Sequence, residues 1–195
     1  MVASAPPPRP LTGSSSAPLS GTDGVADTVR VWVVASALVE REGELLLVLN
    51  QRRGGSTDWS TPGGVIDATD ASVLDGLTRE VEEETGLRVR SWEGPVYEVH
   101  AEAVDLGWRM RSEVHRAIEF DGELILEDPD GIVIDAAFVP VDACADRLAA
   151  CLQWVREPLT DWLEGRWGPT DRRGYRYAVR GSSLDDFEVL QVTVE

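Results

Sequence analysis

The chain has 195 residues, 43% of them hydrophobic, and a formal net charge of −17. This length and hydrophobic content suit one globular domain, while the negative charge argues against nucleic acid as a partner. The longest apolar stretch, Val31 to Val39, is too short to span a bilayer, so we expect no membrane partner.

Residues 1–27 are rich in Pro, Ser, Ala and Gly without periodicity, which predicts a disordered leader. Residues 28–195 are predicted to form a single domain that ends in a strand and helix extension. The N-terminus lacks a basic stretch followed by an apolar core, and Cys144 and Cys151 are expected to be reduced thiols. These features predict a cytoplasmic protein.

Two strands are predicted next, at Val29–Leu38 and at Leu45–Leu49. Arg52 and Arg53 follow the second strand, and a planar guanidinium suits phosphate oxygens. The two arginines are therefore candidate substrate-binding residues, and surface solubility is the competing interpretation. Trp59 is a third candidate because its ring can stack on a base, although a tryptophan on a strand more often packs in the core.

A helix is predicted after the Gly63-Gly64 pair. Ser72, with Asp75 three residues later, resembles a capping box at its start. Gly86 can adopt the left-handed conformation that ends a helix.

Four glutamates lie within one five-residue stretch of this predicted helix. At about 100° per residue, Glu83 lies about 60° to one side of Glu80 and Glu84 about 40° to the other, while Glu82 points away. Each like-charge pair at this spacing costs about a few tenths of a kcal/mol. A hard cation such as Mg²⁺ prefers carboxylate oxygens and would turn repulsion into binding. The pattern predicts a metal site, and a solvated acidic face is the alternative.

The stretch from Gly64 to Leu87 resembles the Nudix box, a loop–helix–loop motif written G-x5-E-x7-R-E-U-x-E-E-x-G-U with U aliphatic. Its second half matches at every fixed position: Arg79, Glu80, Val81, Glu83, Glu84, Gly86 and Leu87. Its first half departs twice. Asp70 stands where the first glutamate belongs, and eight residues rather than seven separate it from Arg79. If the extra residue is placed earlier instead, Ala71 takes that position and the acid is lost.

The chain after residue 87 is predicted to contain both strands and helices. Strands are predicted at Arg88–Trp92, Val96–Val104 and Arg109–Phe120, with a hairpin turn at Asp121-Gly122. A loop precedes a buried strand at Ile132–Val139. Helical stretches are predicted from Pro140 to about Gln153 and from Pro158 to near Gly165. A terminal hairpin or a pair of added strands is predicted at Tyr175–Val179 and Phe187–Val194.

The resemblance implies an α/β fold, a Nudix-type α/β/α sandwich with a mixed central sheet. It implies Mg²⁺- or Mn²⁺-dependent hydrolysis of a pyrophosphate bond in a nucleoside diphosphate linked to another moiety, such as an ADP-ribose-like compound, a nucleotide sugar or a (d)NTP. By this resemblance Glu80, Glu83 and Glu84 are the metal ligands, with the carbonyl of Gly63 as a further one. Arg79 orients a catalytic glutamate, and the catalytic residues are expected to be Glu80, Glu83 and Arg79.

The identity of the general base stays open at this stage. Glu80 is the first choice, and acids of a later loop, Glu127, Asp128 and Asp130, are alternatives whose competing interpretation is a solvated turn.

Three functions are compatible with the sequence. The first is a small-molecule nucleotide pyrophosphohydrolase, for which a homodimer is possible by family analogy. The second is a Nudix-fold nucleotide-binding or regulatory module that has lost catalysis, motivated by Asp70 and the insertion. The third is an acidic interaction protein without enzyme activity, which leaves the Gly63-Gly64 pair unexplained.

Overall fold

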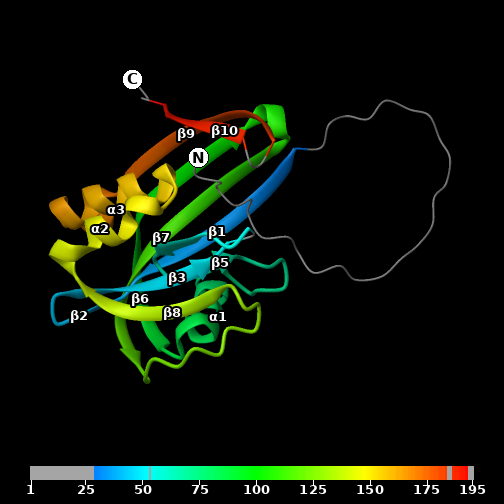
Figure 1. The fold of residues 1–195 in the computed structure, drawn as a ribbon. Helices are drawn as coiled ribbons and strands as arrows, with labels where there is room; N and C mark the ends of the chain where they lie inside the picture. The colour runs from blue at the N-terminus through cyan, green and yellow to red at the C-terminus, as the bar shows by residue number, and fades with distance from the viewer. Residues whose placement is uncertain (1–28, 53, 184–185, 193–195) are drawn as a thin grey trace.

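The structure, a computed structural model, describes residues 29–52, 54–183 and 186–192 as two sheets with helices on both sides (Figure 1). The predicted leader, Arg53 and the last residues of the predicted terminal strand lie outside the described residues. Among the described helices, none is long and apolar enough to cross a bilayer.

The larger sheet contains six strands: β1 (Arg30–Leu38), β5 (Gly63–Val65), β6 (Arg88–Ala103), β7 (Trp108–Asp121), β9 (Arg173–Ser183) and β10 (Asp186–Gln191). Their order is β10-β9-β6-β7-β1-β5. Strands β1 and β7 are parallel, as are β6 and β9, and the other neighbours are antiparallel. The sheet is therefore mixed, as expected.

The smaller sheet is built around β3 (Glu44–Gln51). Strands β2 (Glu40–Arg41) and β4 (Thr57–Ser60) pair with successive parts of β3, and β8 (Val133–Pro140) pairs with its whole length. All these pairs are antiparallel.

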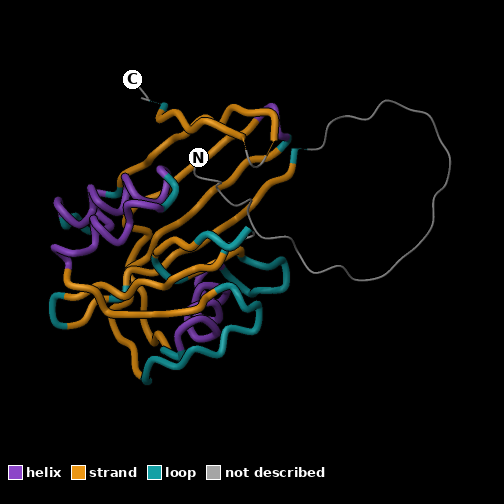
Figure 2. Tube along the Cα trace, in the orientation of Figure 1, coloured by secondary structure: helices purple, strands orange, loops and turns teal. Residues whose placement is uncertain are grey.

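The helices are α1 (Val73–Thr85), α2 (Cys144–Arg147) and α3 (Gln153–Gly165), with short 3-10 turns η1 (Val104–Leu106), η2 (Val141–Ala143), η3 (Leu148–Ala150) and η4 (Pro169–Asp171). Figure 2 shows α1 apart from the α2–α3 segment, with strands between them. Helix α1 buries Leu77 and Val81 in one apolar cluster, and α3 buries Leu159 and Trp162 in another. The two clusters give the helix–sheet–helix layering.

Helix α1 has the ends that its sequence predicts. The Ser72 hydroxyl accepts the backbone N–H of Asp75 at 3.1 Å and donates to the Asp75 carboxylate at 2.6 Å. Gly86 has a φ of 75° and its N–H closes on the carbonyl of Glu82. Both caps are thus confirmed.

Two predictions about strands were wrong. The segments predicted at Arg88–Trp92 and Val96–Val104 form the single strand β6, which stays paired with β7 across irregularities in register. The hairpin predicted at Asp121-Gly122 does not form, because the next strand, β8, joins the smaller sheet. The intervening chain instead follows the end of α1, where the N–H of Ile125 donates to the carbonyl of Thr85 at 2.9 Å.

The predicted helical stretches also differ from those observed. The first is divided into η2, α2 and η3 rather than continuing to Gln153. The second begins at Gln153, and Pro158 lies inside it, so Pro158 is not a start point. A proline costs a helix one backbone donor, and burial of Trp154, Leu159 and Trp162 favours the continuous helix. The terminal strands β9 and β10 do form an antiparallel hairpin.

Candidate functional site

The glycine pair at β5 brings the loop into contact with α1. The N–H of Gly63 donates to Oε2 of Glu84 at 2.8 Å. Gly63 has a φ of 134°, and a Cβ there would overlap the carbonyl oxygen of Ala35. A Cβ at Gly64 would lie 2.5 Å from Oε2 of Glu80. Gly64 therefore leaves room for Glu80 of α1, whereas Gly63 needs glycine for its φ and for its close contact with β1.

The acidic edge of α1 follows the predicted arc. Glu80 and Glu84 face the glycine pair, whereas Glu83 is held at Arg79 by a 2.9 Å contact. Glu82 turns away and pairs with Arg88 at 2.6 Å. Three glutamates thus share one side of the helix and the fourth does not.

The guanidinium of Arg79 contacts three carboxylates, those of Glu80, Glu83 and Asp70. Its Nη1 lies 2.8 Å from Oε1 of Glu80 and 2.9 Å from Oε2 of Glu83. Its Nε and Nη2 donate to the two oxygens of Asp70 at 3.3 and 3.2 Å. The hydrogen bonds from Arg79 lower the pKa of Asp70, and Asp70 in turn raises the pKa of Arg79.

Burial opposes ionisation on the side of α1 that meets the loop. Burial, together with the nearby charges of Glu80 and Asp128, raises the pKa of Glu84 to about 8, against the lowering effect of the Gly63 N–H. Burial also raises the pKa of Glu80, and the charge of Asp130 adds to this. A bound cation would favour the ionised form of both glutamates.

The donor chemistry of this edge fits a hard divalent cation. Glu80, Glu83 and Glu84 supply carboxylate oxygens. At Glu84, burial raises the pKa more than the Gly63 N–H and the charge of Arg52 lower it. Within the described ranges, no three His, Cys, Asp or Glu side chains already converge on one point. Arg79 occupies oxygens of Glu80 and Glu83 instead.

The loop before β8 contains two acids, Asp128 and Asp130, whose charges act on Glu84 and Glu80 of α1. One oxygen of Asp128 accepts the N–H groups of Ile132 and Val133 at 2.6 and 2.7 Å, and the other accepts that of Asp130 at 3.1 Å. Asp128 therefore closes its own loop, rather than lying in a freely solvated turn. Glu127 is exposed.

The substrate-binding candidates lie beside β4. Arg52 makes a two-point ion pair with Asp58, at 2.6 and 3.1 Å. Trp59 is half-buried against the larger apolar cluster, with the guanidinium of Arg147 at 4.9 Å from its ring centroid. Arg53 lies outside the described residues. Asp58 was not anticipated, since a cross-strand partner cannot be read from a chain without its strand pairing.

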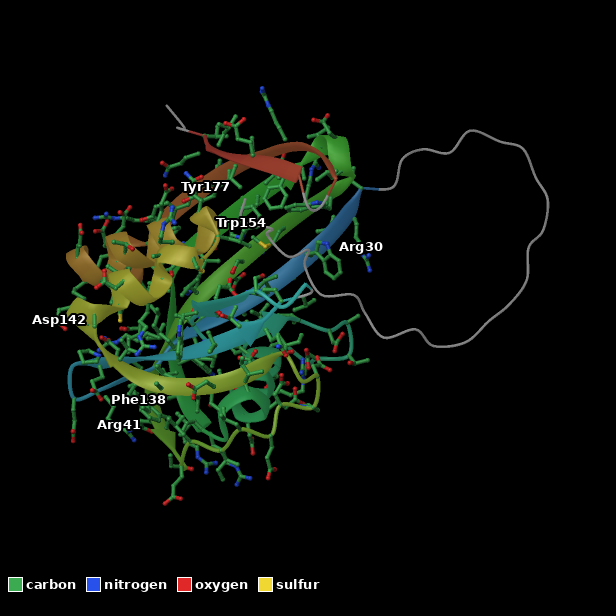
Figure 3. All side chains as sticks on the ribbon, viewed as in Figure 1. Arg30, Arg41, Phe138, Asp142, Trp154 and Tyr177 are labelled. Carbon is green, nitrogen blue, oxygen red and sulfur yellow. The ribbon has the colours of Figure 1, made fainter. Side chains whose placement is uncertain are left out.

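A small apolar hollow lies between the larger sheet and α3. It is lined by aromatic and aliphatic side chains together with a few hydroxyl groups: Ser36, Thr61, Tyr97, Val99, Met110, Ser112, Trp154 and others. Trp154, labelled in Figure 3, comes from α3. The sequence predictions missed this set, although the alternating pattern of the two long strands gives a signal for one apolar face.

Comparison with known proteins gives one family. A model of the NUDIX domain matches residues 29–163. None of the curated proteins compared with the chain matches it.

Several solved structures share the fold. A MutT protein from Bacillus halodurans is 20% identical with a TM-score of 0.60, over 82% of this chain and 97% of that chain. A NUDIX hydrolase from Nitrosomonas europaea is 23% identical with a TM-score of 0.56, over 73% and 95%. A MutT NUDIX hydrolase from Burkholderia pseudomallei is 24% identical with a TM-score of 0.54, over 69% and 97%. These identities show similarity of fold.

Proposed function

This chain belongs to the NUDIX domain family. We propose that it is a Nudix-type pyrophosphohydrolase that hydrolyses the pyrophosphate bond of a nucleoside diphosphate linked to another moiety, with Mg²⁺ or Mn²⁺ as cofactor. ADP-ribose-like compounds, nucleotide sugars and (d)NTPs are the candidate substrates. The observation that carries the proposal is the meeting of Glu80 and Glu84 with the Gly63-Gly64 pair.

The proposed metal ligands are Glu80, Glu83 and Glu84, with the carbonyl of Gly63. A divalent ion held there would neutralise charge on the diphosphate and lower the pKa of a bound water. Arg79 orients Glu80, which it contacts at 2.8 Å, and Glu80 is the proposed base that accepts the proton of the attacking water.

The substrate's nucleoside end is proposed to enter the hollow lined by Tyr97, Met110 and Trp154. Ser36 lines this hollow and also pairs with Gly63 across β1 and β5. One residue pair therefore connects the apolar surface with the acidic edge. Aromatic and apolar side chains favour the faces of a base.

Arg52 and Arg53 are proposed to contact the terminal phosphates. Arg52 is already oriented by Asp58 and keeps 28% of its side chain exposed, so its remaining N–H groups can donate to phosphate oxygens. Trp59 is proposed to contribute a stacking surface beside the apolar hollow. A cytoplasmic location, a possible homodimer and the domain limits 28–195 likewise stay predictions.

A catalytically inactive module is the second candidate, because Arg79 forms ion pairs with two of the three glutamates proposed as metal ligands. The test is turnover of a nucleotide panel with Mg²⁺ or Mn²⁺, with products separated by anion-exchange chromatography. Glu83→Gln is expected to lower the rate by at least about a hundredfold with folding intact, since it removes a charge-stabilising group. Glu82→Gln is the matched control, because Glu82 lies on the same helix but pairs with Arg88. Equal rates for wild type and Glu83→Gln would refute the catalytic assignment.

A further inference from the structure

The loop that enters α1 contains the chain's two departures from the family pattern, an aspartate and one added residue. We propose that these departures compensate for each other: the extra residue before the helix lets the shorter side chain of Asp70 position Arg79. This inference rests on the proposed function for its kinetic consequence. Its structural part concerns the loop alone.

Asp70 is fixed by its own turn before it reaches Arg79. The N–H of Asp67 donates to Oδ2 of Asp70 at 2.9 Å, and the N–H of Asp70 donates to the carbonyl of Asp67 at 3.1 Å. The Asp70 side chain is only 11% exposed. A carboxylate that is bonded from its own loop has little freedom to adjust its reach.

Gly76 limits the length of the side chain that fits at position 70. A Cβ at Gly76 would lie 2.6 Å from Oδ2 of Asp70 and 2.9 Å from Cδ1 of Ile66. The carboxylate therefore lies directly against the first turns of α1. With the present loop, a glutamate at position 70 would carry its carboxylate about one C–C bond, roughly 1.5 Å, too far.

The geometry of Arg79 shows what this positioning does. Asp70 takes the Nε and Nη2 edge of the guanidinium, which leaves Nη1 for Glu80 and Glu83. That edge can bind a carboxylate at two points. Without Asp70, it would be free to bind Glu80 or Glu83 and compete for the oxygens proposed to hold the metal.

The experiment compares four changes: Asp70→Asn, Asp70→Glu, deletion of Ala71, and Asp70→Glu combined with that deletion, which restores the family spacing. Each single change is expected to lower kcat by roughly tenfold to a hundredfold, as misplacement of a positioning group does, and to raise the Mg²⁺ concentration for half-maximal rate. The combined change is expected to restore kcat to within about threefold of wild type. Asp67→Asn is the control, because the Asp67 side chain is 68% exposed and lies 3.9 Å from Arg79.

A second measurement does not depend on turnover. In metal-free protein, the Nε–Hε resonance of Arg79, assigned by its loss in Arg79→Lys, should shift or exchange faster in Asp70→Asn and return in the combined variant. An Asp70→Asn protein with wild-type resonance and rate would overturn the proposal, as would a combined variant no better than its singles. A wild-type protein without turnover would refute the proposed function, while the resonance would still test the loop.

Discussion

At the scale of single residues, Gly64 sets how closely the loop lies to Glu80. Its neighbour Gly63 is constrained by φ, whereas Gly64 is constrained by the space that its missing side chain leaves for a carboxylate. Because that carboxylate is the proposed base, the spacing at Gly64 affects chemistry more than folding.

Gly64→Ala should therefore lower kcat more than it lowers stability. The added methyl carbon would lie 2.5 Å from Oε2 and 2.8 Å from Cδ of Glu80, so the side chain must move. We expect a loss of at least about tenfold in kcat, since small displacements of catalytic groups are costly. Steady-state kinetics and thermal unfolding measure the two effects. Gly174→Ala is the control, because no atom of the residues that the structure describes lies within 4 Å of its added carbon. A normal kcat in Gly64→Ala would show that this contact is dispensable.

The two thiols provide an independent check on the core. Burial raises the pKa of Cys144 to about 11 and that of Cys151 to about 12. Because the thiolate is the reactive form, neither should react with a disulfide reagent at a pH of about 8 until the protein unfolds. Titration with and without guanidinium chloride measures this. Rapid labelling of the folded protein would contradict the packing of α2 and η3.

At the scale of elements, α1 is the part of the fold that its own sequence predicts best. Ser72, Asp75 and Gly86 act on neighbouring backbone groups, so their effect does not depend on the rest of the chain. The hairpin predicted at Asp121-Gly122 does not form, because strand pairing there depends on a distant part of the chain. Gly122 does adopt a φ of 109°, but strand pairing after it is decided by β3, which lies far away in the sequence.

Ser72→Ala should lower the free energy of unfolding by about 1 kcal/mol, the usual effect of losing an N-cap side chain. The reason is the lost acceptor for the N–H of Asp75. Urea denaturation measures the change, and Ser72→Thr should recover most of it because the hydroxyl is kept. If Ser72→Thr is as unstable as Ser72→Ala, the capping bond is not the cause.

At the scale of the whole molecule, the candidate site combines residues that are close together in the sequence with residues that are far apart in it. The glutamate edge comes from a single helix, and its arc follows from helical periodicity. The hollow combines β1, β6, β7 and α3, and Arg52 meets Asp58 only through the pairing of β3 and β4. Spacing along the chain contains no information about such contacts. The helical half of the site was therefore predictable, whereas the apolar half was not.

Cation binding tests whether these parts act as one site. If the glutamate edge binds Mg²⁺, the folded state should gain free energy, by about 1.4 kcal/mol at ten times Kd, and the melting temperature should rise by a few degrees. Glu84→Gln should lose most of this rise, because burial raises the pKa of Glu84 and a bound cation would favour its ionised form. Glu82→Gln should keep it, since Glu82 faces Arg88. Differential scanning calorimetry with and without Mg²⁺ measures these shifts. If Mg²⁺ raises the melting temperature of wild type and Glu84→Gln equally, the ion binds elsewhere, and cation binding does not involve the contact between Glu84 and Gly63.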